Sequence, residues 1–327
     1  MRNWFLFLLL VSVVHLKSQP QTYPSKFVVA QDGTGDFKTI QEAVNAVRDL
    51  SQQKVTIFIK RGIYHEKLVI PSWKTKIALV GEDRDATVIS NNDYSGKLFP
   101  GGKDQFQKDK FTTYTSYTVL VQGDDFSAEN LTIENSAGRV GQAVALHLEA
   151  DRCVVRNCKL IGNQDTLYVA KEFNRHYFLN CEIEGTTDFI FGEATAVFQN
   201  CVIRSLINSY VTAAATGPAQ QYGFVFLDCH LIADTAAKKV FLGRPWRPHA
   251  KTVFIHCNLD SHIVKEGWDN WRNPENEKTV LYAEFNNYGA GSDMKNRVNW
   301  SRQLTAKQAK QYKLENIFKG RPHWIPN

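Results

Sequence analysis

Apolar and polar positions recur along the middle of the chain with a period too long for a single helix turn or strand. Two apolar residues, a variable one, Asn, Asp or His, then Cys, a variable one and an apolar one occur at 154–160, 177–183, 197–203, 225–231 and 253–259. The spacings of 20 to 28 residues and the β-rich content favour a parallel β-helix over leucine-rich or helical repeats. We therefore predict an all-β fold, a right-handed single-stranded parallel β-helix over about 27–285.

The polar position of the repeat predicts a corner of each coil. Phe178, Cys181 and Ile183 do not alternate strictly, but a bend at Asn180 would turn all three inward. Asn, Asp and His are the non-glycine residues that best tolerate the left-handed conformation of such a bend. Five of the six cysteines follow this position, so we expect a buried ladder of free thiols. The predicted corner residues are Asn157, Asn180, Asn200, Asp228 and His256.

The two ends of the repeat region have their own signals. Strands are predicted from Phe27 and at 55–60, 67–70 and 77–80, and Thr39 with Glu42 predicts a capping box for a short N-terminal helix that covers the end of the solenoid. Residues 91–115 are polar and rich in Gly and Lys, which indicates a long excursion, either part of a substrate cleft or a surface loop. Near the C-terminus, Thr305 predicts a helix through Lys313, and 314–318 should pack back onto the coils.

The N-terminus indicates export. Arg2, an apolar run over 4–14 and a polar stretch at 17–19 predict a signal peptide at 1–18, too short to span a bilayer. Its removal lowers the formal charge from +6 to +4. No composition shift marks a second domain, so we expect 19–327 to form one domain, secreted (extracellular or periplasmic), monomeric and without a membrane helix. No Lys/Arg run with interleaved aromatic residues indicates nucleic acid.

Two aspartates occupy the same place in consecutive copies of the repeat. Asp165 and Asp188 each lie seven residues after a repeat cysteine, and the two cysteines are 181 − 158 = 23 residues apart. Stacked coils would bring the two carboxyl groups within about one strand spacing, ~4.8 Å, which suits acid–base and nucleophilic chemistry. Turn residues would give the same pattern, and Asn208 at the third copy suits a turn equally well. The repeat alone leaves both readings open.

Five motifs, which occur in a fixed order along the chain, favour a catalytic role for the two aspartates. They are Gly-Ile-Tyr-His-Glu at 62–66, Gln-Ala-Val-Ala-Leu at 142–146, Gly-Asn-Gln-Asp-Thr-Leu-Tyr at 162–168, Asp-Phe-Ile-Phe-Gly at 188–192 and Leu-Gly-Arg-Pro-Trp at 242–246. Together they resemble the pectinesterases (pectin methylesterases), over most of the chain from residue 27. The stretches Asn-Ser-Tyr-Val-Thr-Ala-Ala from 208 and Glu-Gly-Trp-Asp-Asn-Trp from 266 resemble the bacterial branch of this family more than the plant branch.

The resemblance implies a role for each matching residue. Asp188 would be the nucleophile toward a galacturonate methyl ester, and Asp165 the acid that protonates methanol and then the base toward water. Arg244 would orient Asp188 and keep it ionised. Gln142 and Gln164 would donate to the oxyanion. Phe191, Trp246 and Tyr168 would contact the substrate, which is pectin (methyl-esterified homogalacturonan).

No cofactor or metal is expected. His65, His176 and His256 are scattered without ligand spacing, and surface or corner positions are predicted for them. Two other functions stay open: a pectate lyase or polygalacturonase on a similar β-helix, and a non-catalytic glycan-binding solenoid. A lyase would need several converging carboxylates for Ca²⁺ and a basic residue that abstracts a proton. Methanol release in the presence of a chelator would separate the esterase from the lyase.

Overall fold

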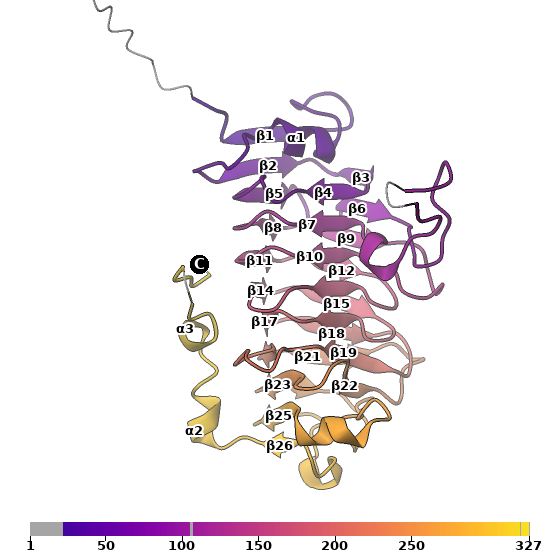
Figure 1. Ribbon diagram of the computed structural model, residues 1–327, viewed down its shortest axis with the longest axis vertical. Coiled ribbons are helices and arrows are strands. Elements are labelled where there is room, and N and C mark those ends of the chain that lie inside the picture. Colours follow the sequence, from indigo (N-terminus) through magenta and orange to yellow (C-terminus); the bar gives the residue numbers. More distant parts are fainter. Residues whose placement is uncertain (1–21, 105–106, 321, 327) are drawn as a thin grey trace, which may run out of the picture.

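The strands stack into a right-handed parallel β-helix (Figure 1). The structure is a computed structural model that describes residues 22–104, 107–320 and 322–326, so the predicted signal peptide at 1–18 lies outside the described residues. The central coils each contribute one strand to each of three sheets, and these strands pair in parallel with their equivalents on the next coil. The predicted fold class is confirmed.

The three sheets of the described chain contain 7, 8 and 11 strands. The seven-stranded sheet consists of β4 (Leu68–Ile70), β7 (Val119–Val121), β10 (Leu146–Leu148), β13 (Leu167–Val169), β16 (Ile190–Gly192), β19 (Tyr210–Ala214) and β22 (Phe241–Pro245). The eight-stranded sheet consists of β3 (Gly62–His65), β6 (Thr87–Asn91), β9 (Thr132–Asn135), β12 (Lys159–Ile161), β15 (Glu182–Gly185), β18 (Val202–Ser205), β21 (His230–Ala233) and β24 (Asn258–Leu259).

The eleven-stranded sheet runs the full length of the solenoid. Its strands are β1 (Lys26–Val29), β2 (Val55–Ile59), β5 (Ile77–Gly81), β8 (Ser127–Glu129), β11 (Cys153–Arg156), β14 (Arg175–Leu179), β17 (Thr195–Gln199), β20 (Phe224–Leu227), β23 (Lys251–Ile255), β25 (Leu281–Phe285) and β26 (Arg302–Gln303). Parallel pairing with β26 extends the sheet past residue 285, where the prediction ended. Short β3 and β6 were not predicted as strands.

The predicted corner ladder is confirmed by the backbone. Asn157, Asn180, Asn200, Asp228 and His256 all have positive φ, between 46° and 54°. Each lies between a strand of the eleven-stranded sheet and the next strand of the eight-stranded sheet. The left-handed bend therefore turns the side chains on both sides of it into the interior, as the apolar pattern requires.

The interior contains in-register columns of identical residues. The rings of Phe178, Phe198, Phe226 and Phe254 stack on successive coils, with centroids 4.7, 4.5 and 4.3 Å apart. All six cysteines fall within the described chain and are buried and free, as predicted. Repetition of the same side chain on every coil gives close packing without a separate solution for each layer.

Helix α1 (Ile40–Ala46) covers the N-terminal end of the solenoid and contacts β1, β2 and β4. Thr39 and Glu42 form the predicted capping box. The Glu66 carboxylate adds two further bonds, because it accepts from the backbone amides of Ile40 and Gln41 at 2.9 and 3.0 Å. The Gly-Ile-Tyr-His-Glu motif thus ends in a residue that anchors the cap.

The C-terminal segment folds back along the outer face of the eleven-stranded sheet (Figure 1). This segment contains α2 (Ala306–Ala309) and α3 (Leu314–Ile317). The 3₁₀ turns of the described chain are η1 (Thr113–Thr115), η2 (Pro274–Lys278) and η3 (Met294–Asn296). Ile317 and Phe318 pack against Tyr177, Val197 and Val225, as predicted. The predicted helix from Thr305 to Lys313 is too long, since α2 ends at Ala309.

His176 is fully buried inside the solenoid, where Nε2 lies 2.8 Å from the Ala150 carbonyl oxygen. The predicted surface or corner position is therefore wrong for this residue.

Across the described residues we find no helix with both the length and the apolar character needed to cross a membrane.

Candidate active site

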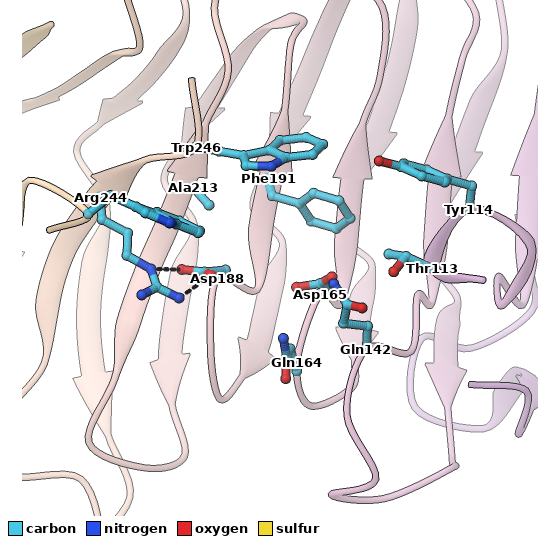
Figure 2. A pocket seen from close by; sticks show the side chains of 11 residues that line it. Thr113, Tyr114, Gln142, Gln164, Asp165, Asp188, Phe191, Ala213, Arg244 and Trp246 are labelled. Atoms are coloured by element: carbon cyan, nitrogen blue, oxygen red, sulfur yellow. Dashed lines mark hydrogen bonds and ion pairs between the residues drawn. The ribbon is translucent and has the colours of Figure 1, made fainter. Parts of the chain in front are cut away.

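A pocket lies over the outer face of the seven-stranded sheet and gathers residues from successive coils (Figure 2). Most of the predicted site residues line it, together with four that were not predicted. The lining residues are Thr113, Tyr114, Gln142, Gln164, Asp165, Asp188, Phe191, Ala213, Arg244, Trp246 and Trp271.

Asp165 and Asp188 are neighbours on adjacent coils. Leu167 pairs with Ile190, which places the two aspartates opposite each other two residues earlier. Both have positive φ, 66° and 51°, so each turn presents its carboxyl group to the pocket. Both side chains are nearly buried. The repeat therefore predicted the pair correctly.

The third copy of the repeat does not extend this column. The cysteines at 181 and 201 are 20 residues apart, whereas Asp188 pairs by register with Tyr210, 22 residues later. Asn208 therefore lies two residues out of line with the aspartates. Its Oδ1 accepts from the backbone amides of Lys238 and Lys239 at 2.6 and 2.8 Å, which is a turn role.

Arg244 on β22 binds one member of the pair. Its Nε and Nη2 donate to the two carboxylate oxygens of Asp188 at 2.9 and 2.7 Å (Figure 2). The guanidinium lies 4.0 Å from the ring centroid of Tyr210 and 3.8 Å from that of Trp271, so cation–π contacts hold it as well. A planar fork held by two rings fixes the orientation of the Asp188 carboxylate.

The environment separates the two carboxyl groups in acidity. Burial raises the pKa of Asp165 to about 8, and the charge of Asp188 adds to the increase, against a hydrogen bond from Gln142 and the charge of Arg244. Burial also raises the pKa of Asp188, but the hydrogen bonds and charge of Arg244 oppose the increase. Asp165 therefore holds a proton more readily, while the ion pair with Arg244 favours the ionised form of Asp188.

Gln142 and Gln164 lie on successive coils, where they form an isolated parallel bridge. Both side chains line the pocket beside the carboxyl groups. The amide of Gln142 hydrogen-bonds to Asp165. Neutral amide donors at this position add no charge of their own, which suits stabilisation of a transient negative oxygen.

Aromatic rings flank the carboxyl groups on the other side (Figure 2). Phe191 pairs in register with Ala213 and Ala213 with Arg244, so these residues share one row across β16, β19 and β22. The ring of Trp246 meets Phe191 edge-on at 5.9 Å. Tyr168 does not line the pocket. The ring of Tyr168 stacks on that of Phe191, with ring centroids 4.5 Å apart, and so supports the pocket wall from the preceding coil.

Four lining residues were not predicted. Thr113 and Tyr114 belong to η1 in the 91–115 excursion, which therefore contributes to the pocket rather than forming only a surface loop. Trp271 lies within the Glu-Gly-Trp-Asp-Asn-Trp stretch, so the sequence carried a signal for it. Ala213 lies within the Asn-Ser-Tyr-Val-Thr-Ala-Ala stretch, and the polar composition of 91–115 had left a place in a substrate cleft open, but neither signal identified the individual residues.

The described residues include no group of three or more His, Cys, Asp or Glu side chains arranged to hold a metal ion. His65 and His256 lie apart on β3 and at a corner.

Comparisons with known proteins identify the family. The family model described as Pectinesterase matches residues 26–321. This chain belongs to the Pectinesterase family. It is 36% identical over 286 residues to Pectinesterase 31 of Arabidopsis thaliana, with 86% of this chain and 88% of that protein covered. It is 37% identical over 316 residues to Probable pectinesterase/pectinesterase inhibitor 58 of the same plant, covering 91% of this chain but 52% of that protein.

Solved pectin methylesterases share the fold. Pectin methylesterase from carrot superposes with a TM-score of 0.81 at 33% identity and covers 91% of this chain and 94% of the carrot chain. A pectin methylesterase in complex with a hexasaccharide superposes with a TM-score of 0.78 at 32% identity, covering 94% of this chain and 100% of that one. The named plant relatives do not test the predicted closeness to the bacterial branch, which stays a prediction.

Proposed function

We propose that the pectinesterase chain demethylesterifies pectin, hydrolysing the methyl esters of homogalacturonan to methanol and a free uronate. One observation carries the proposal: two equivalent carboxyl groups share a pocket, and the Arg244 fork binds only Asp188. Membership of the family and the hexasaccharide complex of a pectin methylesterase support the same substrate class.

Asp188 is the proposed nucleophile. Its carboxylate attacks the ester carbonyl carbon, the carbonyl oxygen takes the negative charge, and the amide groups of Gln142 and Gln164 donate to it. Collapse of this tetrahedral species expels methoxide, which Asp165 protonates to methanol. An anhydride then joins Asp188 to the uronate.

Asp165 serves again in the second half of the reaction. Now ionised, it takes a proton from water, and the resulting hydroxide attacks the anhydride carbonyl and releases the uronate and the Asp188 carboxylate. Both groups return to their starting protonation states. The roles need one acid and one nucleophile, which is the division that burial and Arg244 create.

The aromatic side of the pocket is the proposed sugar site. Phe191 and Trp246 present apolar surface beside the carboxyl groups, which suits a pyranose face and a methyl group. In this proposal Tyr168 acts through Phe191, on which it stacks, instead of contacting the sugar directly.

Export and the monomeric state are also proposals. The N-terminal charge and apolar pattern support secretion of the chain, which would place it with an extracellular polysaccharide. We expect a monomer without nucleic-acid or membrane partners.

The test is methanol release from methyl-esterified homogalacturonan by the purified protein, with and without EDTA. We expect equal methanol release under both conditions. A chelator-sensitive activity that is restored by Ca²⁺ and forms unsaturated uronate would support the lyase. Sugar binding without methanol release would support the glycan-binding solenoid.

A further inference from the structure

The excursion between β6 and β7 forms an arm, defined here as residues 92–104 and 107–115, that projects from the coils beside β6 (Figure 1). Bonds within the arm join its outgoing and returning legs: Gly96 N donates to the Phe111 carbonyl at 2.8 Å, and Phe99 N donates to the Asp109 carbonyl at 2.9 Å. Its returning leg ends in η1, which supplies Thr113 and Tyr114 to the pocket wall. The position of this wall therefore depends on how the arm is held against the solenoid.

Lys67, between β3 and β4, meets both legs of the arm at once. Its Nζ donates to Asp93 Oδ2 at 2.7 Å on the outgoing leg and to the Thr115 carbonyl at 2.6 Å on the returning leg. The same ammonium lies 4.3 Å from the ring centroid of Phe111 and 4.6 Å from that of Tyr117. The Lys67 ammonium thus joins the solenoid to both legs of the arm and to the aromatic rings beside η1.

The surroundings keep this contact charged and directional. The Lys67 side chain is 28% exposed and that of Asp93 is 9% exposed. Burial lowers the pKa of Lys67, while the bonds from Lys67 and Lys97 outweigh burial and lower the pKa of Asp93. Loss of the ammonium would remove one of the two lysine partners of the Asp93 carboxylate and leave the Thr115 carbonyl without this donor.

We infer that Lys67 is a positioning residue for substrate binding: through Asp93 and Thr115 it holds Thr113 and Tyr114 against the pocket. This inference rests on the proposed function, because pectin is the ligand whose binding the wall would affect. Other bonds also reach the arm, since Ser95 N donates to the Gln142 carbonyl at 2.9 Å and Asn135 Nδ2 donates to the Asp93 carbonyl at 2.9 Å. Loss of Lys67 should therefore displace the wall without releasing the whole arm.

Lys74 offers a matched control. Lys74 is buried, whereas Lys67 is half-buried, and the Nζ of Lys74 binds the Asn45 carbonyl at 2.8 Å, the Val47 carbonyl and Asp49 Oδ1 at 2.8 Å. These partners lie at the end of α1 and none of them lines the pocket. Lys74→Met removes a buried ammonium with several bonds but leaves the arm untouched.

The experiment compares Lys67→Met and Lys74→Met in methanol-release kinetics on methyl-esterified homogalacturonan. We expect Lys67→Met to raise KM about tenfold with kcat within about twofold, since displacement of Thr113 and Tyr114 would remove binding that is common to the ground state and the transition state. Lys74→Met should lower the melting temperature and leave KM unchanged. Amide hydrogen exchange should rise over 93–104 and 107–115 in Lys67→Met only.

A double-mutant comparison tests whether Lys67 acts through the pocket wall. Tyr114→Ala should raise KM in the wild type and add little in the Lys67→Met background, because the wall is already displaced. Asp93→Asn, which removes the charge but keeps the shape, should give the same pattern more weakly and serves if Lys67→Met does not fold. An unchanged KM in folded Lys67→Met, an equal rise in Lys74→Met, or additive effects with Tyr114→Ala would overturn the inference. Absence of methanol release by the wild type would instead reject the proposed function.

Discussion

Asp165 and Asp188 have the same left-handed backbone on adjacent coils, yet only Asp188 is bound by a cation through two hydrogen bonds. The repeat therefore makes the two residues equivalent, and Arg244, which lies outside the repeat, makes them different. The difference in pKa follows from burial of both groups and from this one-sided ion pair. It is the physical basis for assigning one residue as acid and the other as nucleophile.

Substitution of Arg244 should change the pH profile in a defined direction. Arg244 opposes the rise in the pKa of Asp188, so its loss raises that pKa further. Because Asp188 must be ionised to attack, the acid limb of kcat/KM should move to higher pH in Arg244→Gln. Arg244→Lys should retain part of the charge effect but lose the two-point geometry. An acid limb at the wild-type pH in Arg244→Gln would contradict this role.

Substitution of Asp165 should slow the reaction and remove the alkaline limb. Asp165 must be protonated to act as acid, and its pKa is raised to about 8, so wild-type kcat/KM should fall as the pH rises past about 8. Asp165→Asn should lower kcat by ~10²–10⁴-fold, the usual contribution of a general acid–base group. Pre-steady-state and steady-state methanol release across pH would measure both effects. An unaltered alkaline limb in the variant would show that another group titrates there.

Asp165 should also lower the free energy of unfolding at neutral and alkaline pH. Its folded-state pKa of about 8 lies above the ordinary value of 3.8, so the folded protein retains a proton that the unfolded chain has lost between these values. The free energy of unfolding from this group therefore decreases as the pH rises toward 8. Asp165→Asn should melt at a higher temperature than the wild type at pH 8, with a smaller gain near pH 4. Asp228→Asn, at an exposed corner with the same backbone conformation, is the control and should show no such trend.

The sequence predicted the features that repeat and missed those that do not. Corner residues, inward columns and the adjacency of Asp165 and Asp188 all follow from one period, which is why the structure confirms them. Thr113 and Tyr114 line the pocket from the arm, and the contacts between the arm and the coils leave no periodic pattern in the sequence.

Local signals failed where tertiary packing decided the outcome. Thr305 caps α2 as predicted, but the chain leaves the helix after Ala309, and Tyr312 and Leu314 pack on the outer face of the eleven-stranded sheet. Similarly, His176 fills an interior position of β14, where its register partners are Cys153 and Ala196. Neither outcome is visible from residue type alone.

The cysteine ladder should be chemically silent in the folded protein. The six thiols are buried and free, so a thiol reagent does not reach them in the folded protein, and burial also raises the pKa of Cys158 to about 12. Thiol titration without reductant should find almost no reactive groups in the native protein and six after denaturation. Fewer than six in the denatured protein would indicate that some of the stacked residues are disulfide-bonded.

Asp188→Asn tests the central assignment most directly. Asn retains the size of the side chain and tolerates the positive φ of this turn, so the variant should fold with an unchanged circular dichroism spectrum. Asp228→Asn is again the matched control and should retain full activity. The measurement is methanol release from methyl-esterified homogalacturonan by the wild type and the two variants. We predict that Asp188→Asn releases no methanol above background, whereas near-normal release by the folded variant would contradict Asp188 as the nucleophile.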